Sequence, residues 1–132
     1  MMKIEVVIIV LYLCHTLADY THLSTAWMLN AKKVGTPIGP IAVHAAVHAT
    51  LMGISLAILW YSNFINFDFD VAGASILVQF ASHLAIDVGK GTANGYFPKL
   101  LNPANKWHWV LFGTDQFLHL VVIVAMASLI TY

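Results

Sequence analysis

The sequence contains no arginine, and only 9% of its 132 residues are charged. Without arginine the chain lacks the planar, five-donor side chain that proteins favour for two-point binding of phosphates and bases. Its net charge is zero when histidine is neutral, so it also lacks the basic surplus that attracts a polyanion. These two absences argue against a nucleic-acid partner.

Cysteine occurs once, at Cys14. A single cysteine cannot form a disulfide within the chain, which excludes a disulfide-stapled small domain and leaves the redox compartment open. In an apolar segment such a cysteine is typical of a small packing residue. The beginning of the chain, Lys3 followed by apolar residues, resembles a signal peptide. Because the same segment carries a polar pair described below, we interpret it as a retained first membrane span.

Apolar sequence is what the chain has in abundance: 60% of the residues are hydrophobic and the mean hydropathy is +0.79. Four segments come close to the ~20 residues that a helix needs to cross a membrane, and helix is the form that satisfies their backbone in lipid. We therefore predict an all-α fold, a single transmembrane domain over residues 1–132. It would be an integral membrane four-helix bundle with antiparallel up-down connections. The predicted spans are residues 4–20, 41–61, 71–88 and 107–130.

The segments between these spans carry prolines, glycines and asparagines and are predicted to be connections. Residues 22–30 have helix-forming composition, so they are a candidate continuation of the first helix along the membrane surface. Residues 89–106 hold three glycines, three asparagines and two prolines. We expect a loop there, with room for a short interfacial helix.

Lysine is distributed unevenly about the predicted spans. The N-terminus, the second connection and the C-terminus share one side of the membrane and have only Lys3. The first and third connections share the other side and carry the remaining five: Lys32, Lys33, Lys90, Lys99 and Lys106. Because lysine concentrates on the cytoplasmic side, we predict a multi-pass protein of the bacterial inner (plasma) membrane with both termini outside. We interpret the lysines as orientation signals, with contact to an anionic headgroup as the alternative.

Each predicted span also carries one pair of ionisable residues spaced four apart, which places both members on one face of a helix. Such residues are expensive inside a membrane and by default mark a functional site. The pairs are His15/Asp19, His44/His48, His83/Asp87 and Asp115/His119.

The four pairs share one depth. The first and third pairs end their spans and the second and fourth pairs begin theirs, so all face the lysine-rich side. All eight side chains lie within about two to three helical turns of that boundary, at ~1.5 Å per residue. Helices that alternate in direction can point them at a shared axis. The parallel order of the pairs in the two halves of the chain also indicates a candidate duplication of one helix pair.

The ordered pattern resembles a known family. Its elements are His-x3-Asp with a downstream Trp-Met, then His-x3-His, then His-x3-Asp with a nearby lysine, and finally Asp-Gln-x2-His. Here these are His15, Asp19, Trp27, Met28, His44, His48, His83, Asp87, Lys90, Asp115, Gln116 and His119. The pattern is similar to that of an uncharacterised family of small bacterial and phage integral membrane proteins, filed as a domain of unknown function. A looser similarity is to membrane-bound metal-dependent hydrolases with His/Asp motifs near helix ends.

Histidine and aspartate without cysteine suit zinc, manganese or iron, whereas calcium and magnesium favour sets richer in oxygen. A divalent metal is therefore the expected cofactor. Two arrangements would use all eight side chains. In one, a single ion is bound and aspartates orient the ligating imidazoles; in the other, two ions lie ~3.5–4 Å apart. A metal-free hydrogen-bond or proton-relay network and haem with two axial histidines are the alternatives. The predicted metal ligands are His15, Asp19, His44, His48, His83, Asp87, Asp115 and His119.

Three functions fit this pattern. The first is a metal-dependent hydrolase that acts on a lipid-linked or headgroup substrate at the cytoplasmic interface, with Asp19 or Asp87 as the catalytic base. The second is ion or proton transport through the same cluster, and the third is a metal that only staples the bundle. Lysines around the cluster favour an anionic lipid-linked substrate. Membrane lipid is the expected partner, and a homo-oligomer is a further expectation, because four helices alone make a narrow pathway.

Overall fold

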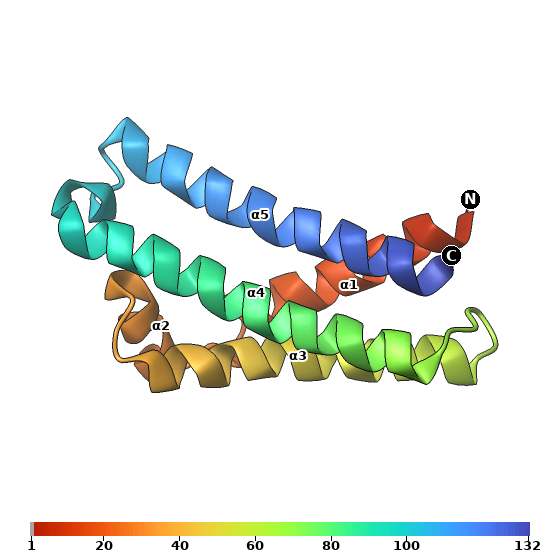
Figure 1. Cartoon of the computed structure of the whole chain (residues 1–132). Coiled ribbons are helices and arrows are strands. Elements are labelled where there is room, and N and C mark those ends of the chain that lie inside the picture. The colour runs from red at the N-terminus through yellow and green to blue at the C-terminus, as the bar shows by residue number, and fades with distance from the viewer. Residues whose placement is uncertain (1) are drawn as a thin grey trace.

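The structure, a computed structural model, describes residues 2–132 (Figure 1). These residues form five α-helices and one short 3-10 helix, and the described part of the chain contains no strand. The prediction of an all-helical fold is confirmed. The elements are α1 (Met2–Tyr20), α2 (Ala26–Val34), α3 (Ile38–Tyr61), α4 (Phe69–Tyr96), η1 (Pro98–Leu101) and α5 (Lys106–Thr131).

Three of the helices, α3, α4 and α5, are long and apolar enough to cross a membrane. They contain 24, 28 and 26 residues, and each includes one of the predicted later spans. This indicates a membrane protein. The first predicted span, residues 4–20, corresponds to α1, which has 19 residues and three charged side chains, Lys3, Glu5 and Asp19.

The four long helices lie side by side (Figure 1). Each of them packs against two others: α1 and α4 both contact α3 and α5. The short helix α2 covers one end of this arrangement, where it contacts α3 and α4, and η1 contacts α4 and α5. The N- and C-termini lie at the opposite end (Figure 1).

Each long helix buries one stripe of residues three or four apart, and the stripe changes character along the helix. Toward the termini it is apolar and forms a core that includes Leu11, Met52, Leu56, Ile123 and Met126. Toward α2 the same stripes carry histidine and aspartate. The outer surface is apolar instead: Leu77 and Phe117, for example, are 70% and 63% exposed. Polar side chains inside and apolar ones outside suit a bundle surrounded by lipid.

The segment after α1 differs from the predicted continuation along the membrane surface. Helix α1 ends at Tyr20, and α2 is a separate helix whose N-cap, Thr25, accepts a hydrogen bond from the Met28 amide. Met28 and Ala31 are buried, so α2 packs onto the bundle. It ends at Gly35, which has a positive φ of 76° that glycine adopts without strain.

Helix α4 continues past residue 88, where a connection was expected, and ends at Tyr96. The glycines that suggested a loop lie within the helix. Gly91 is buried against α2, and a Cβ atom there would lie 2.5 Å from the Lys32 carbonyl oxygen. Glycine at this position therefore permits the close approach of two backbones rather than a turn.

Candidate metal centre

The eight predicted ligands come together at the α2 end of the bundle, because the helices alternate in direction and each points its pair inward. The five histidines are at most 2% exposed. Their rings pack against one another, with centroids 3.8 Å apart for His48 and His83, and 4.2 Å apart for His83 and His119. The other two rings join the set: the centroid of His15 lies 4.8 Å from that of His119, and the centroid of His44 lies 4.6 Å from that of His48.

The donors of this cluster fall into three groups. In each group every residue offers one ligand atom, and these atoms all lie within 4.8 Å of one another. The largest is a four-donor group formed by one aspartate and three histidines. Neighbouring groups share His83 or His119, so the set is continuous, and all eight predicted residues belong to it. The groups are Asp19/His44/His48/His83, His15/His83/His119 and Asp87/Asp115/His119.

The three aspartates are the acidic part of the cluster, and each lies beside histidine. An oxygen of Asp19 is 3.1 Å from Nε2 of His44 and 3.3 Å from Nε2 of His48. Asp87 is fully buried, with an oxygen 3.3 Å from Nε2 of His83. Asp115 lies 3.6 Å from Nε2 of His119. Imidazole nitrogens and carboxylates are thus interleaved, which is the ligand chemistry of a zinc, manganese or iron site.

Two lysines that we interpreted as orientation signals reach into the cluster. The Lys32 ammonium on α2 lies 3.2 Å from an oxygen of Asp19 and 3.2 Å from an oxygen of Asp87. Burial alone would lower the pKa of Lys32, but the carboxylates of Asp87 and Asp19 outweigh it and raise that pKa. Lys90 on α4 lies 2.8 Å from Asp115. Sequence spacing did not identify these contacts.

A serine that the sequence did not single out holds His44. Nδ1 of His44 lies 3.2 Å from the Ser24 hydroxyl, and this hydroxyl donates to the Ala18 carbonyl oxygen at 2.7 Å. Because the Ser24 hydroxyl donates its proton to the Ala18 carbonyl oxygen, its oxygen accepts a hydrogen bond from Nδ1–H of His44. That arrangement leaves the lone pair on Nε2, which faces the cluster, as a metal ligand requires.

Many polar atoms of the cluster lack a hydrogen bond. Among the described residues, ten buried nitrogen and oxygen atoms of the eight predicted ligands make none, although several lie at ion-pair distance from a neighbour. They include both ring nitrogens of His15, His48 and His83 and both oxygens of Asp87. Buried polar atoms are normally satisfied, so this concentration fits a set of donors that bind a cation.

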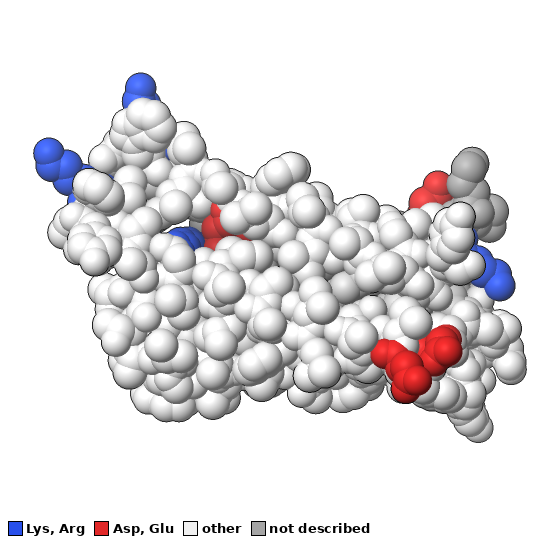
Figure 2. Space-filling model, viewed as in Figure 1, with Lys and Arg blue, Asp and Glu red and all other residues white. Residues whose placement is uncertain are grey.

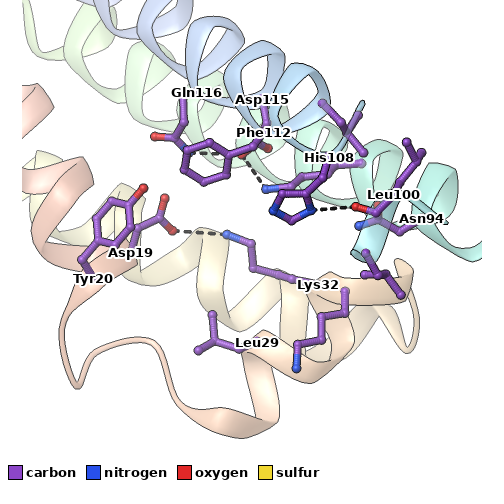
Figure 3. A pocket seen from close by; sticks show the side chains of 14 residues that line it. Asp19, Tyr20, Leu29, Lys32, Asn94, Leu100, His108, Phe112, Asp115 and Gln116 are labelled. Atoms are coloured by element: carbon purple, nitrogen blue, oxygen red, sulfur yellow. Dashed lines mark hydrogen bonds and ion pairs between the residues drawn. The ribbon is translucent and has the colours of Figure 1, made fainter. Parts of the chain in front are cut away.

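A cavity of about 350 Å³ adjoins the cluster (Figure 3). Asp19 and Lys32 approach it from one side and Asp115 from the other, as Figure 3 shows. Leucines and Phe112 form much of its wall, and His108 lines it while bonded at 2.7 Å to the Leu100 carbonyl oxygen. The cavity therefore combines a charged inner surface with apolar walls.

A second hollow, of about 410 Å³, lies between α4 and α5. Its walls include Ile86, Leu111 and Leu118, and Lys90 and Asp115 also line it. Figure 2 shows acidic and basic side chains meeting in a hollow on the face that α4 and α5 present, whereas the other charged side chains in this view lie toward the two ends of the molecule. The Lys90–Asp115 pair thus borders both cavities.

The profile of one family, described as a protein of unknown function, DUF3307, matches residues 7–132. The chain belongs to the DUF3307 family. The match includes all eight donors, and it confirms the prediction of an uncharacterised family. No curated protein and no solved structure matches the chain.

Proposed function

We propose that this DUF3307 protein is a membrane-embedded, metal-dependent hydrolase that acts on a lipid-linked or headgroup substrate at the membrane interface. One observation carries the proposal: a buried set of metal-binding side chains borders a cavity of headgroup size. Asp19 and Asp115 belong to both the set and the cavity wall. A metal that only stapled the bundle would need no such cavity.

The charge of the cluster supports a divalent ion. Three carboxylates and the two ammonium groups of Lys32 and Lys90 leave one net negative charge when the histidines are neutral. An unpaired charge in a membrane interior costs about 2.5–3.5 kcal/mol on insertion scales. One divalent cation with one hydroxide or one singly charged substrate group brings the total to zero, whereas two divalent ions leave a surplus of positive charge. The charges thus favour a single ion.

The four-donor group is the best place for that ion. It offers one carboxylate oxygen and three imidazole nitrogens, from Asp19, His44, His48 and His83. A manganese or iron ion held there, or a zinc ion held by three of the four donors, would keep a position for a water, lower the pKa of that water and polarise a carbonyl or phosphoryl oxygen. The other four donors would orient the ligands or accept a proton.

Of the two aspartates predicted as catalytic, Asp87 is the better base. Asp19 belongs to the four-donor group, whereas Asp87 lies outside it with an oxygen 3.3 Å from Nε2 of His83. Its carboxylate is fully buried, so bulk water does not compete for it. From this position Asp87 would take the proton of the attacking water, and Asp19 would hold the metal.

The two cavities favour a lipid-linked substrate. The cavity of about 350 Å³ that adjoins the cluster has lysines for an anionic group and leucines for an apolar one. The hollow between α4 and α5 has apolar walls on the outer surface of the bundle, where an acyl or prenyl chain can enter sideways from lipid. We further propose that α1 is a fourth span in the bacterial inner membrane, with both termini outside, so that the site faces the cytoplasm.

The test compares wild type with Asp87→Asn and with His22→Ala, a control whose histidine is exposed and outside the donor groups. Each protein is purified in detergent, stripped with a chelator, reloaded with Mn²⁺ or Zn²⁺, and incubated with micelles of a phospholipid panel. Mass spectrometry measures the products. We expect metal-dependent turnover by wild type and His22→Ala, and a loss of about 100-fold or more in Asp87→Asn. Equal turnover with and without metal would contradict the proposal.

A further inference from the structure

The position of Lys32 has a consequence for metal binding. Its ammonium lies 2.9 Å from Nε2 of His44 and 3.2 Å from Oδ1 of Asp19. Both of these residues belong to the four-donor group. The Lys32 ammonium therefore contacts two of the ligand atoms that would hold the metal ion of the proposed function.

The ammonium and a metal ion cannot both bind Nε2 of His44. An imidazole nitrogen carries one lone pair, which accepts a hydrogen bond or binds a metal, but not both. The Ser24 hydroxyl holds the proton of His44 on Nδ1, so the lone pair in question is the one on Nε2. A metal ion bound to His44 must displace the Lys32 ammonium from it.

We propose that Lys32 couples metal binding to the binding of an anion: a divalent ion displaces its ammonium from His44, and the released ammonium binds an anionic group of the phosphate class in the adjoining cavity. This inference rests on the metal site of the proposed function. Lys32 is then the residue that recognises the anionic group of the substrate, and metal binding is what releases it to do so.

The geometry gives the released ammonium a place to go. Lys32 already lines the cavity, along with Lys33 and Lys90. Its long side chain is flexible and has three donors, so a displaced head can keep its contact with Asp87 while it turns toward the cavity. The cavity volume, about 350 Å³, lies within the range of small-ligand sites.

The metal also removes a repulsion. Without metal, the Asp19 carboxylate faces the cavity that Lys32 lines, and a phosphate there would approach a negative charge. A divalent ion on Asp19 cancels that charge at the moment when it releases the ammonium. Both changes favour an anion, so metal and anion should each strengthen the binding of the other by the same factor.

The buried amide of Asn94 adds a second polar group to the cavity. Asn94 is 5% exposed and lines the cavity, and its side-chain oxygen makes no hydrogen bond with any described residue. An amide in this position can contact a phosphate ester through its NH₂ group or a substrate hydroxyl through its oxygen. The cavity therefore offers neutral as well as cationic recognition.

The experiment measures both ligands on the intact protein in detergent. Mn²⁺ affinity is obtained from the electron paramagnetic resonance of free Mn²⁺, and calorimetry gives the affinity for sn-glycerol 3-phosphate with Mn²⁺ and with a chelator. The variants are Lys32→Gln and, as a matched control, Lys33→Gln, whose lysine lines the same cavity without an ion-pair contact to the cluster.

For wild type and Lys33→Gln we expect Mn²⁺ to strengthen glycerol phosphate binding about tenfold, within the usual range of coupling between sites. Lys32→Gln should bind Mn²⁺ more tightly than wild type and lose most of that tenfold effect. A full Mn²⁺ effect in Lys32→Gln, or weaker Mn²⁺ binding by it, would overturn the inference and leave the metal site standing. No Mn²⁺ binding by wild type would overturn the proposed function as well.

A measurement on wild type alone guards against misfolding of the variant. Lysine acetylation, followed by peptide mass spectrometry, reports how accessible each ammonium is. Mn²⁺ should increase the acetylation of Lys32 and leave that of Lys33 unchanged. A Lys32 that is equally protected with and without bound Mn²⁺ would show that the metal does not displace it, which contradicts the inference.

Discussion

Gly91 of α4 packs directly against Gly35, the residue that ends α2. A Cβ atom added to Gly91 would lie 2.5 Å from the Gly35 Cα atom and 2.5 Å from the Lys32 carbonyl oxygen. Real Cβ atoms essentially never come so close to a backbone. The contact fixes α2 on α4 and thereby sets the position from which the Lys32 side chain reaches the cluster.

Replacing Gly91 with alanine should push α2 away from α4. Overpacking of this kind costs about 1–3 kcal/mol. Gly89 is the matched control, because it lies in the same helix and a Cβ atom there would meet nothing within 4 Å. Thermal denaturation in detergent should show a lower midpoint for Gly91→Ala and an unchanged or higher one for Gly89→Ala. Equal midpoints for the two variants would contradict the close packing of α2 against Gly91.

The Ser24 hydroxyl should matter for metal binding although it is no ligand. Removing a partner that orients a ligating histidine typically weakens metal binding 10–100-fold. We therefore expect Ser24→Ala to bind Mn²⁺ or Zn²⁺ about 10-fold or more weakly than wild type in an equilibrium titration. Ser62→Ala is the control, since Ser62 is exposed and its hydroxyl donates to the Leu59 carbonyl oxygen, outside the cluster. Unchanged affinity in Ser24→Ala would show that His44 needs no such support.

Much of the cluster follows from the sequence, because the i, i+4 pairs depend only on helix geometry. His83 and Asp87, for instance, share a face in any helix that contains both. The roles of Lys32 and Ser24 could not be predicted in this way. Both lie beyond the end of α1 and reach the cluster only because α2 folds back onto the bundle. That docking depends on the approach of Gly35 to Gly91, a contact between residues 56 positions apart.

The predicted connection after residue 88 was wrong for a similar reason: the deciding contact is between residues far apart in the sequence. The glycines after residue 88 were interpreted as loop-forming, since glycine weakens an isolated helix. In the structure α4 runs through them to Tyr96. The close packing of α2 against Gly91 offsets the low helix propensity of these glycines. Such a contact between distant residues cannot be predicted from the local composition.

The number of spans can be tested with reporters at the two ends of the chain. If α1 crosses the membrane along with α3, α4 and α5, both termini lie on the same side. If only the three helices long and apolar enough to cross do so, the termini lie on opposite sides. We expect reporters fused before Met1 and after Tyr132 both to be active outside the cytoplasm. A cytoplasmic N-terminus with an external C-terminus would support three spans.

The central claim is that the buried histidines and aspartates bind a metal ion, and metal content tests it most directly. Wild type, His48→Ala and His22→Ala would be purified from cells grown with supplemented metals and examined by inductively coupled plasma mass spectrometry. We predict about one zinc, manganese or iron ion per chain in wild type and in His22→Ala, and a large loss in His48→Ala, which lacks one of the four donors. Wild type that stays metal-free under saturating metal, or a His48→Ala variant as fully loaded as wild type, would contradict the claim.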